Sequence, residues 1–173
     1  MDTPRPPDLL GKNKTHAEHV VRLAKQLADG SRPGVLGTID ANGQPHLRWM
    51  ATISLREFPR LYALTSPKSR KVEHVRANPK VNWMFTSEGA TMVINLFGNA
   101  TIVSDKNEVN RIWGLIENKS SAYFLSLNTA AEGIAVIETT IEDIECVVPR
   151  YDLHYPPRMD DFSLLHPEKA AAQ

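Results

Sequence analysis

Apolar residues recur at helical spacing in three segments of the chain. The first segment, residues 15–28, ends at the turn signal Asp29-Gly30. A second helical pattern stops at Asn78-Pro79, and a third covers Glu108–Glu117. Asp105 precedes the third segment and forms a capping pair with its first residue. The pattern therefore predicts three helices, which lie near the start, in the middle and late in the chain.

The segments between these helices are rich in β-branched and aromatic residues and predict β-strands. Asn42-Gly43 is a hairpin turn signal between the first two strands, and Gly98 inside the fifth predicts a β-bulge. Most of the strands are joined by hairpins, and closure into a barrel removes exposed edges. We therefore expect a mainly β fold, a small six-stranded antiparallel barrel with helices. The expected strands are 34–40, 44–54, 60–64, 81–85, 91–103 and 133–148.

The composition is that of one globular domain with short appendages. The 173 residues are 42% hydrophobic, which is enough for a single core. We expect a flexible arm at residues 1–13, a barrel domain at 14–150 and a C-terminal extension at 151–173, which contains three prolines. No internal repeat divides the chain.

Charge and cysteine content narrow the classes of partner. Lys plus Arg and Asp plus Glu both number 20, so there is no basic excess to indicate a nucleic-acid partner. Cys146 is the single cysteine, which rules out an intramolecular disulfide and disfavours a thiolate metal site. The first residues lack the apolar core of a signal peptide, and no apolar run is long enough to span a membrane. We expect a cytoplasmic protein.

A cluster of cations at the start of the second helix is the first sign of a ligand. In the stretch Leu61–Pro79 an apolar strand ends in a tight turn, and Lys68, Arg70 and Lys71 follow at the helix N-terminus. A helix N-terminus offers free N–H groups and the positive end of the helix dipole, which favour a bound anion. A solvated helix cap is the alternative, but basic residues there oppose the dipole unless an anion offsets them. The stretch predicts a phosphate site.

Three stretches of the chain together match a known pattern. They are GVLGTIDANGQPHLRWMAT, LYALTSPKSRKVEHVRANPKVNWMF and the strand around INLFGNATIV. In order and spacing they resemble the flavin-binding split barrel of the pyridoxamine 5'-phosphate oxidase-like superfamily, and within it the general stress protein branch. The resemblance covers about residues 15–148. It implies a six-stranded split barrel, a homodimer, and FMN bound in a groove between the subunits.

The resemblance also implies which residues bind the flavin. Arg48 and the pair Arg70 and Lys71 match the family residues that hold the FMN phosphate. Residues 49–52 match the strand that runs along the flavin ring and the ribityl chain. The complete set of matching positions is Arg48, Trp49, Met50, Ala51, Thr52, Ile53, Leu64, Thr65, Ser69, Arg70 and Lys71.

The residues that bind substrate in pyridoxamine phosphate oxidases are not carried over. Ile53, Ile112 and Ile116 stand where the family has a lysine, a tyrosine and an arginine, and Asp152 replaces the arginine of a C-terminal Arg-x-His motif. Aliphatic residues at these positions would leave a substrate phosphate desolvated and unpaired. A vitamin B6 oxidase is therefore a disfavoured interpretation.

Several functions remain open at this point. The leading one is an FMN-dependent oxidoreductase in which a reduced donor passes electrons through FMN to a small acceptor. The alternative is a non-catalytic flavin store or redox sensor, and a deazaflavin- or haem-using relative ranks last. The six histidines are too scattered to predict a metal cluster. His46 lies two residues before Arg48, so it can approach the flavin from the same strand face, and Cys146 is expected in the core. No catalytic residue is assigned.

Overall fold

The computed structural model describes residues 14–28, 33–52, 58–114, 133–149 and 153–155. The expected arm at residues 1–13 and most of the C-terminal extension lie outside these ranges, so the proposed domain boundaries stay a prediction. Within the described residues, no helix is long and apolar enough to cross a membrane.

All three predicted helices and all six predicted strands are present, with one further short strand. The new strand, β7 (Leu153–Tyr155), lies in the expected extension and pairs antiparallel with β6 (Ala135–Val148). The third helix begins at Lys106 rather than Glu108, because Asp105 Oδ1 accepts a hydrogen bond of 2.9 Å from the Glu108 N–H and caps the helix. The elements are α1 Lys14–Leu27, β1 Gly34–Ile39, β2 Pro45–Met50, β3 Arg60–Thr65, α2 Arg70–Ala77, β4 Lys80–Thr86, the 3₁₀ turn η1 Glu88–Ala90, β5 Val93–Val103, α3 Lys106–Gly114, β6 Ala135–Val148 and β7 Leu153–Tyr155.

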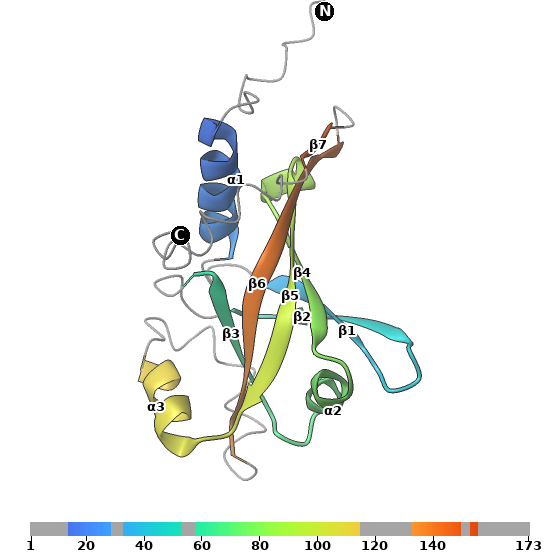
Figure 1. The fold of residues 1–173 in the computed structure, drawn as a ribbon, viewed down its shortest axis with the longest axis vertical. Helices are drawn as coiled ribbons and strands as arrows, with labels where there is room; N and C mark the ends of the chain where they lie inside the picture. The colour runs from blue at the N-terminus through green and yellow to red at the C-terminus, as the bar shows by residue number, and fades with distance from the viewer. Residues whose placement is uncertain (1–13, 29–32, 53–57, 115–132, 150–152, 156–173) are drawn as a thin grey trace, which may run out of the picture.

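The strands form one antiparallel sheet in the order β2-β1-β4-β5-β6-β3, which leaves β2 and β3 as its two outer strands. Figure 1 shows the β1–β2 hairpin and α2 on one side of the long strands β5 and β6, with α3 on the other. The hairpin turns where it was predicted: Gly43 has a φ of +83°, and Asp40 Oδ1 accepts hydrogen bonds from the N–H groups of Asn42 and Gln44. This turn fixes the register of β2.

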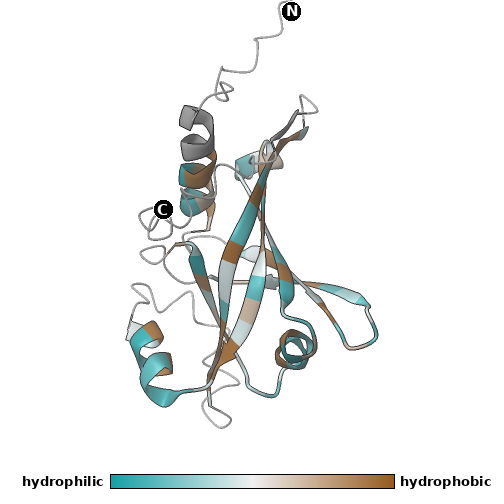
Figure 2. Ribbon diagram, viewed as in Figure 1, coloured by the Kyte–Doolittle hydropathy of each residue, from teal (hydrophilic) through white to brown (hydrophobic). Residues whose placement is uncertain are grey.

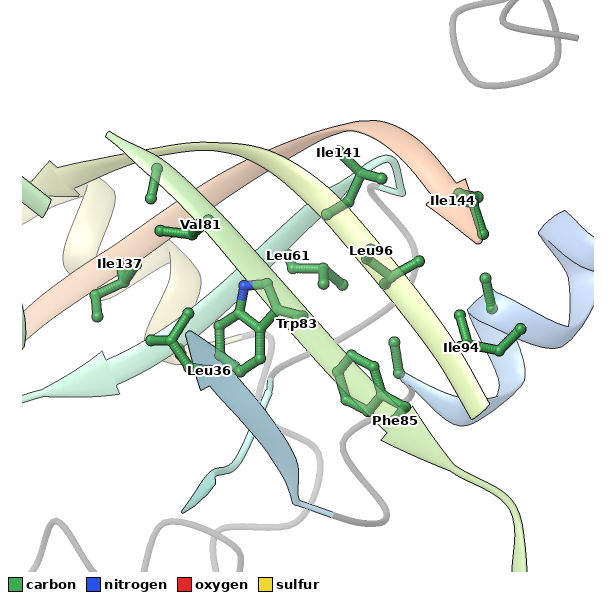
Figure 3. Packing of buried hydrophobic residues seen from close by; sticks show 14 of the residues in the cluster. Leu36, Leu61, Val81, Trp83, Phe85, Ile94, Leu96, Ile137, Ile141 and Ile144 are labelled. Atoms are coloured by element: carbon green, nitrogen blue, oxygen red, sulfur yellow. The ribbon is translucent and has the colours of Figure 1, made fainter. Parts of the chain in front are cut away.

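The core lies between the concave face of the sheet and α1. Trp83 and Phe85 of β4 stack with their ring centroids 6.0 Å apart, and Figure 3 shows their side chains surrounded by aliphatic residues of the other strands. The Trp83 indole N–H donates to Thr139 Oγ1 at 3.2 Å, so the buried polar atom is satisfied. Val20 and Ala24 of α1 complete the cluster. Apolar and polar residues are interleaved along β4 and β5 (Figure 2), as expected for strands with one buried face. β3 is instead buried on both faces, because part of it packs in a second cluster with α3.

Two predictions about single residues in the sheet are confirmed. The register of β5 against β6 shifts between Phe97 and Gly98, which is the predicted bulge. Cys146 is fully buried in the core, and burial, with a smaller effect from Glu145, raises the pKa of its thiol to about 11. Such a thiol is protonated at neutral pH and has no reactive thiolate.

Candidate functional site

A cavity of about 390 Å³ lies between β2 and the N-terminal half of α2. Val72 and Val75 anchor α2 because both are buried in the domain, which leaves the start of the helix beside β2. The cavity is lined by His46, Leu47, Arg48, Trp49, Met50, Ser69, Arg70, Lys71 and His74. Two segments that are 19 residues or more apart in the sequence therefore build one site.

Three cations of this lining, Arg48, Arg70 and Lys71, form what we call the cation cluster. Arg48 comes from β2 and donates from Nη1 to Thr38 Oγ1 at 2.7 Å. Lys71 comes from α2 and donates from Nζ to Thr65 Oγ1 at 3.0 Å, and the same oxygen lies 3.1 Å from Ser69 Oγ. Buried threonine hydroxyls thus hold two of the three cations in place.

The cation cluster is electrostatically strained. Burial lowers the pKa of Lys71 from its ordinary value, and the charges of Arg48 and then Arg70 lower it further. The pKa of Arg48 is lowered in the same way, by burial and then by Arg70. In the described part of the chain, no carboxylate forms an ion pair with any of the three. A bound anion would relieve this repulsion.

The N-terminus of α2 adds donors to the same place. Ser69 is the N-cap residue, but its side chain makes no capping hydrogen bond; its carbonyl oxygen accepts from the Val72 N–H at 2.9 Å. The first N–H groups of an α-helix have no acceptor within the helix, and the helix dipole makes this end positive. The arrangement is that of a site for a phosphate or carboxylate.

Two histidines also line the cavity. His46 was singled out from its position two residues before Arg48, whereas His74 was not predicted as a site residue. The overlooked signal is its spacing: His74 follows Arg70 by four residues, which places both on one face of α2. A histidine four residues after an arginine on a helix is as common on a solvated face as in a binding site, so this spacing did not identify His74 as a site residue.

The structure brings only some of the predicted cofactor residues together at the cavity. Arg48, Trp49, Met50, Ser69, Arg70 and Lys71 line the cavity, and Thr65 contacts it through its bonds to Ser69 and Lys71. Leu64 instead packs in a second core cluster under α3. Thr52 is buried and donates to the Ala28 carbonyl at 3.0 Å, which ties the sheet to the end of α1. Ala51 does not line the cavity, and Ile53 lies outside the described residues.

Within the described residues, no group of three or more His, Cys, Asp or Glu side chains has the geometry of a metal site. His46 has a carboxylate partner, since its Nε2 lies 3.1 Å from Asp40 Oδ2. The chemistry that the described site supports is therefore the binding of an anionic group by cations and backbone donors.

Solved structures of known proteins share this fold. A Clostridium acetobutylicum protein related to general stress protein 26 of Bacillus subtilis matches with a TM-score of 0.67 and 16% identity over 84% of this chain and 97% of its own. General stress protein 26 from Bacillus anthracis matches with a TM-score of 0.60 and 23% identity over 80% and 99%. A haem-binding protein from Mycobacterium smegmatis matches with a TM-score of 0.65 and 12% identity over 84% and 60%.

These matches confirm the predicted split-barrel fold, with six antiparallel strands curled into a half-barrel. Comparison with curated protein sequences gives no significant match. The sequence profile of the family described as "Pyridoxamine 5'-phosphate oxidase" matches residues 22–147, which is more than half of the chain and includes the whole candidate site. The chain therefore belongs to the pyridoxamine 5'-phosphate oxidase family.

Proposed function

We propose that this chain is a cytoplasmic FMN-binding flavoprotein, an oxidoreductase that passes electrons from a reduced donor through FMN to a small acceptor. The observation that carries the proposal is the cation cluster, which meets the open N-terminus of α2 with no carboxylate partner among the described residues. A phosphate ester is the ligand that this combination of fixed cations and free N–H groups fits best.

The expected binding energy is sufficient. A hydrogen bond to a charged group contributes about 1.5–3 kcal/mol, and a helix N-terminus adds about 0.3–1 kcal/mol. Three cations and the helix end therefore supply most of the ~8 kcal/mol that micromolar affinity requires. Contacts between the flavin ring and the apolar residues of β2 would add to this.

The residues present fit FMN in distinct roles. Arg48, Arg70 and Lys71 would hold the phosphate, while Trp49 and Met50 on the same strand as Arg48 would contact the ring system. Bound FMN supplies hydride and electron transfer, for which the protein need only bind, orient and tune the cofactor. This is consistent with a site in which no acid–base residue is assigned.

The substrate is not pyridoxamine phosphate in this proposal. Ile112 of α3, which stands where the oxidases bind substrate phosphate, is fully buried in a cluster with Tyr62 and Val136. An aliphatic side chain in a closed apolar cluster has no donor for a phosphate group. The donor and acceptor are therefore other small molecules.

A second candidate ligand is haem, and one observation favours it. His46 and His74 both line the cavity beside the cations, and imidazoles with nearby cations also suit an iron porphyrin with its carboxylates. A non-catalytic flavin store or sensor, or a deazaflavin in place of FMN, would use the same cation cluster. These alternatives differ in what the purified protein contains.

The test is the absorption spectrum of the purified protein, with mass spectrometry of the molecule released on denaturation. We expect flavin bands, release of FMN, and bleaching of the bands by NADH or NADPH without oxygen. A Soret band with released haem would replace the flavin assignment. Flavin bands that no donor reduces would favour the store or sensor. Failure to retain added FMN would overturn the proposal.

The outer face of the sheet fits a second copy of this chain. Leu47, Trp49 and Phe97 are 74%, 71% and 40% exposed, and the cross-strand register places Leu47 and Phe97 in one row across β2, β1, β4 and β5. Exposed apolar patches mark interaction sites, and an outer strand such as β2 has unpaired backbone N–H and C=O groups along its free edge. Because β2 also lines the cavity, we propose a homodimer in which the partner closes the FMN groove.

Phe97→Glu tests the dimer without changing a residue that lines the cavity. A carboxylate in the centre of an apolar interface is desolvated and unpaired, so we expect the variant to run as a monomer in light-scattering chromatography. Asn110→Glu, an equal change of charge on the exposed face of α3, should leave the dimer intact. A wild-type monomer, or a dimeric Phe97→Glu variant, would contradict this interface.

A further inference from the structure

Two histidine rings lie side by side next to the cation cluster. The ring centroids of His46 on β2 and His74 on α2 are 4.5 Å apart, with their planes inclined at 44°. His46 has Asp40 as its partner, and the pKa of Asp40 is lowered first by the Gln44 backbone hydrogen bond and then by His46. Asp40 is therefore a carboxylate, and it accepts the hydrogen bond from His46 Nε2–H.

His74 has a hydroxyl as its partner. Its Nδ1 lies 3.0 Å from Thr38 Oγ1, the same oxygen that accepts from Arg48 Nη1 at 2.7 Å. A guanidinium can only donate, and a threonine hydroxyl has one proton and two lone pairs. One lone pair of Thr38 is used by Arg48, so its proton is free to point at His74. The ring nitrogen that accepts this proton carries none of its own.

The surroundings keep His74 neutral. Thr38 is 2% exposed and His74 is 8% exposed, so neither group is well hydrated. Burial lowers the pKa of His74, followed by the charges of His46 and Arg48; Asp40 acts in the opposite direction and Arg70 lowers it again. The other charged groups on its own helix are Lys71, which lines the cavity, and Glu73 and Arg76, which do not. The strands β1 and β5, which both pack against α2, carry no titratable side chain.

We propose that His74 is a positioning residue that holds the Arg48 guanidinium for phosphate, through the hydroxyl of Thr38. The inference rests on the proposed function, in which the cation cluster binds the FMN phosphate. The neutral ring accepts a hydrogen bond from the Thr38 hydroxyl, so that a lone pair of the Thr38 oxygen faces Arg48. The hydrogen bonds then form an ordered series in which Arg48 donates to Thr38 and Thr38 donates to His74.

Protonation of His74 would reverse this series. A proton on Nδ1 makes the ring a donor to Thr38, and the buried Thr38 hydroxyl proton loses its acceptor. The hydroxyl would then turn its second lone pair toward Nδ1–H, and the Thr38 oxygen would no longer be held in the orientation that fixes Arg48. The phosphate-specific part of FMN affinity should therefore fall as the pH is lowered through the pKa of His74, which lies below the usual 6.5.

The tautomer of His74 gives a test that needs no ligand. Long-range ¹H–¹⁵N spectra of the whole protein at pH 7.5 distinguish a protonated from an unprotonated Nδ1. We expect the Nε2–H tautomer, and His74→Asn identifies the signals. A Nδ1–H tautomer, or a charged ring, would overturn the proposal.

Binding measurements test the positioning itself. The readout is the ratio of the dissociation constants of riboflavin and FMN, which isolates the phosphate because riboflavin lacks it. At pH 8 we expect His74→Leu and Thr38→Val each to reduce this ratio about tenfold. The double variant should reduce the ratio no further than either single variant does, because both substitutions break the same series of hydrogen bonds. His74→Asn, which keeps a short acceptor, should restore most of the ratio lost in His74→Leu.

The pH dependence of this ratio separates the titration of His74 from that of the phosphate group, whose own second ionisation lies near pH 6. Between pH 5.5 and 8 the ratio should fall more steeply in the wild type than in His74→Asn, which keeps only the titration of phosphate. Equal profiles, additive losses, or an unchanged ratio in His74→Leu would overturn the positioning role alone. A wild-type ratio near one, with no thermal stabilisation by inorganic phosphate, would overturn the proposed function as well.

Discussion

Replacing Arg70 and Lys71 together by alanine should weaken FMN binding by a factor of about a hundred or more. Each residue is expected to make a charge-assisted hydrogen bond to phosphate, which contributes about 1.5–3 kcal/mol, and every 1.4 kcal/mol is tenfold in affinity. Loss of both also removes repulsion within the cation cluster, so the unliganded variant should be at least as stable as the wild type. Fluorescence titration with FMN measures the effect.

The matched control removes two other cations from the same turn and helix. Lys68 and Arg76 are exposed and do not line the cavity, so Lys68→Ala with Arg76→Ala makes an equal change in net charge. We expect FMN affinity to change by less than about threefold, the scale of surface electrostatics. Riboflavin should bind the Arg70 and Lys71 variant nearly as well as the wild type. Equal losses in both double variants would show that the phosphate does not sit in this cluster.

Gly98→Val should destabilise the domain by about 3 kcal/mol or more. A Cβ built on Gly98 falls well inside 3.0 Å of the Thr140 carbonyl oxygen, so β5 and β6 must separate to admit any side chain. Overpacking usually costs about 1–3 kcal/mol, and the cost is higher here because the atoms in the way belong to the backbone, which cannot change rotamer as a side chain can. In a chain of this size, 3 kcal/mol lowers Tm by roughly 6–12 °C. Calorimetry or urea unfolding measures the loss.

Gly37→Ala is the matched control in the same sheet. Its added Cβ would lie 3.3 Å from Leu47 Cδ2, the end of a flexible and exposed side chain that can move. We expect a change of less than about 1 kcal/mol. If Gly98→Val unfolds no more easily than Gly37→Ala, then the close approach at the bulge is not what requires glycine at residue 98.

The fold was largely predictable from the sequence because its determinants are local. Alternating apolar residues, Asn42-Gly43 and the Asp105 cap all act within a few residues, and the structure contains the elements they predict. The predicted second strand extended to residue 54, but β2 ends at Met50. β7 was not predicted, because three residues carry too little periodicity, and only pairing with β6 makes them a strand.

The candidate anion site was predictable in part, for a different reason. Basic residues at a helix N-terminus are unfavourable by themselves, so Arg70 and Lys71 indicated a ligand from local physics alone. The place of Arg48 came from the family resemblance, and the structure puts it in the same cavity. Leu64 and Thr52 also came from the family resemblance. The Leu64 side chain packs in the second core cluster and the Thr52 hydroxyl donates to the Ala28 carbonyl, so their role in cofactor binding stays a prediction.

The sequence by itself determined the strands, the helices and the presence of positive charge at the start of α2. Only the tertiary structure decided which groups meet that charge: the hairpin register sets Thr38 beside Arg48, and the packing of α2 on β1 sets His74 beside Thr38. Thr38, Arg48 and His74 are up to 36 residues apart. Local propensity gives each residue its conformation, but their meeting depends on core packing and strand register, which belong to the whole sheet.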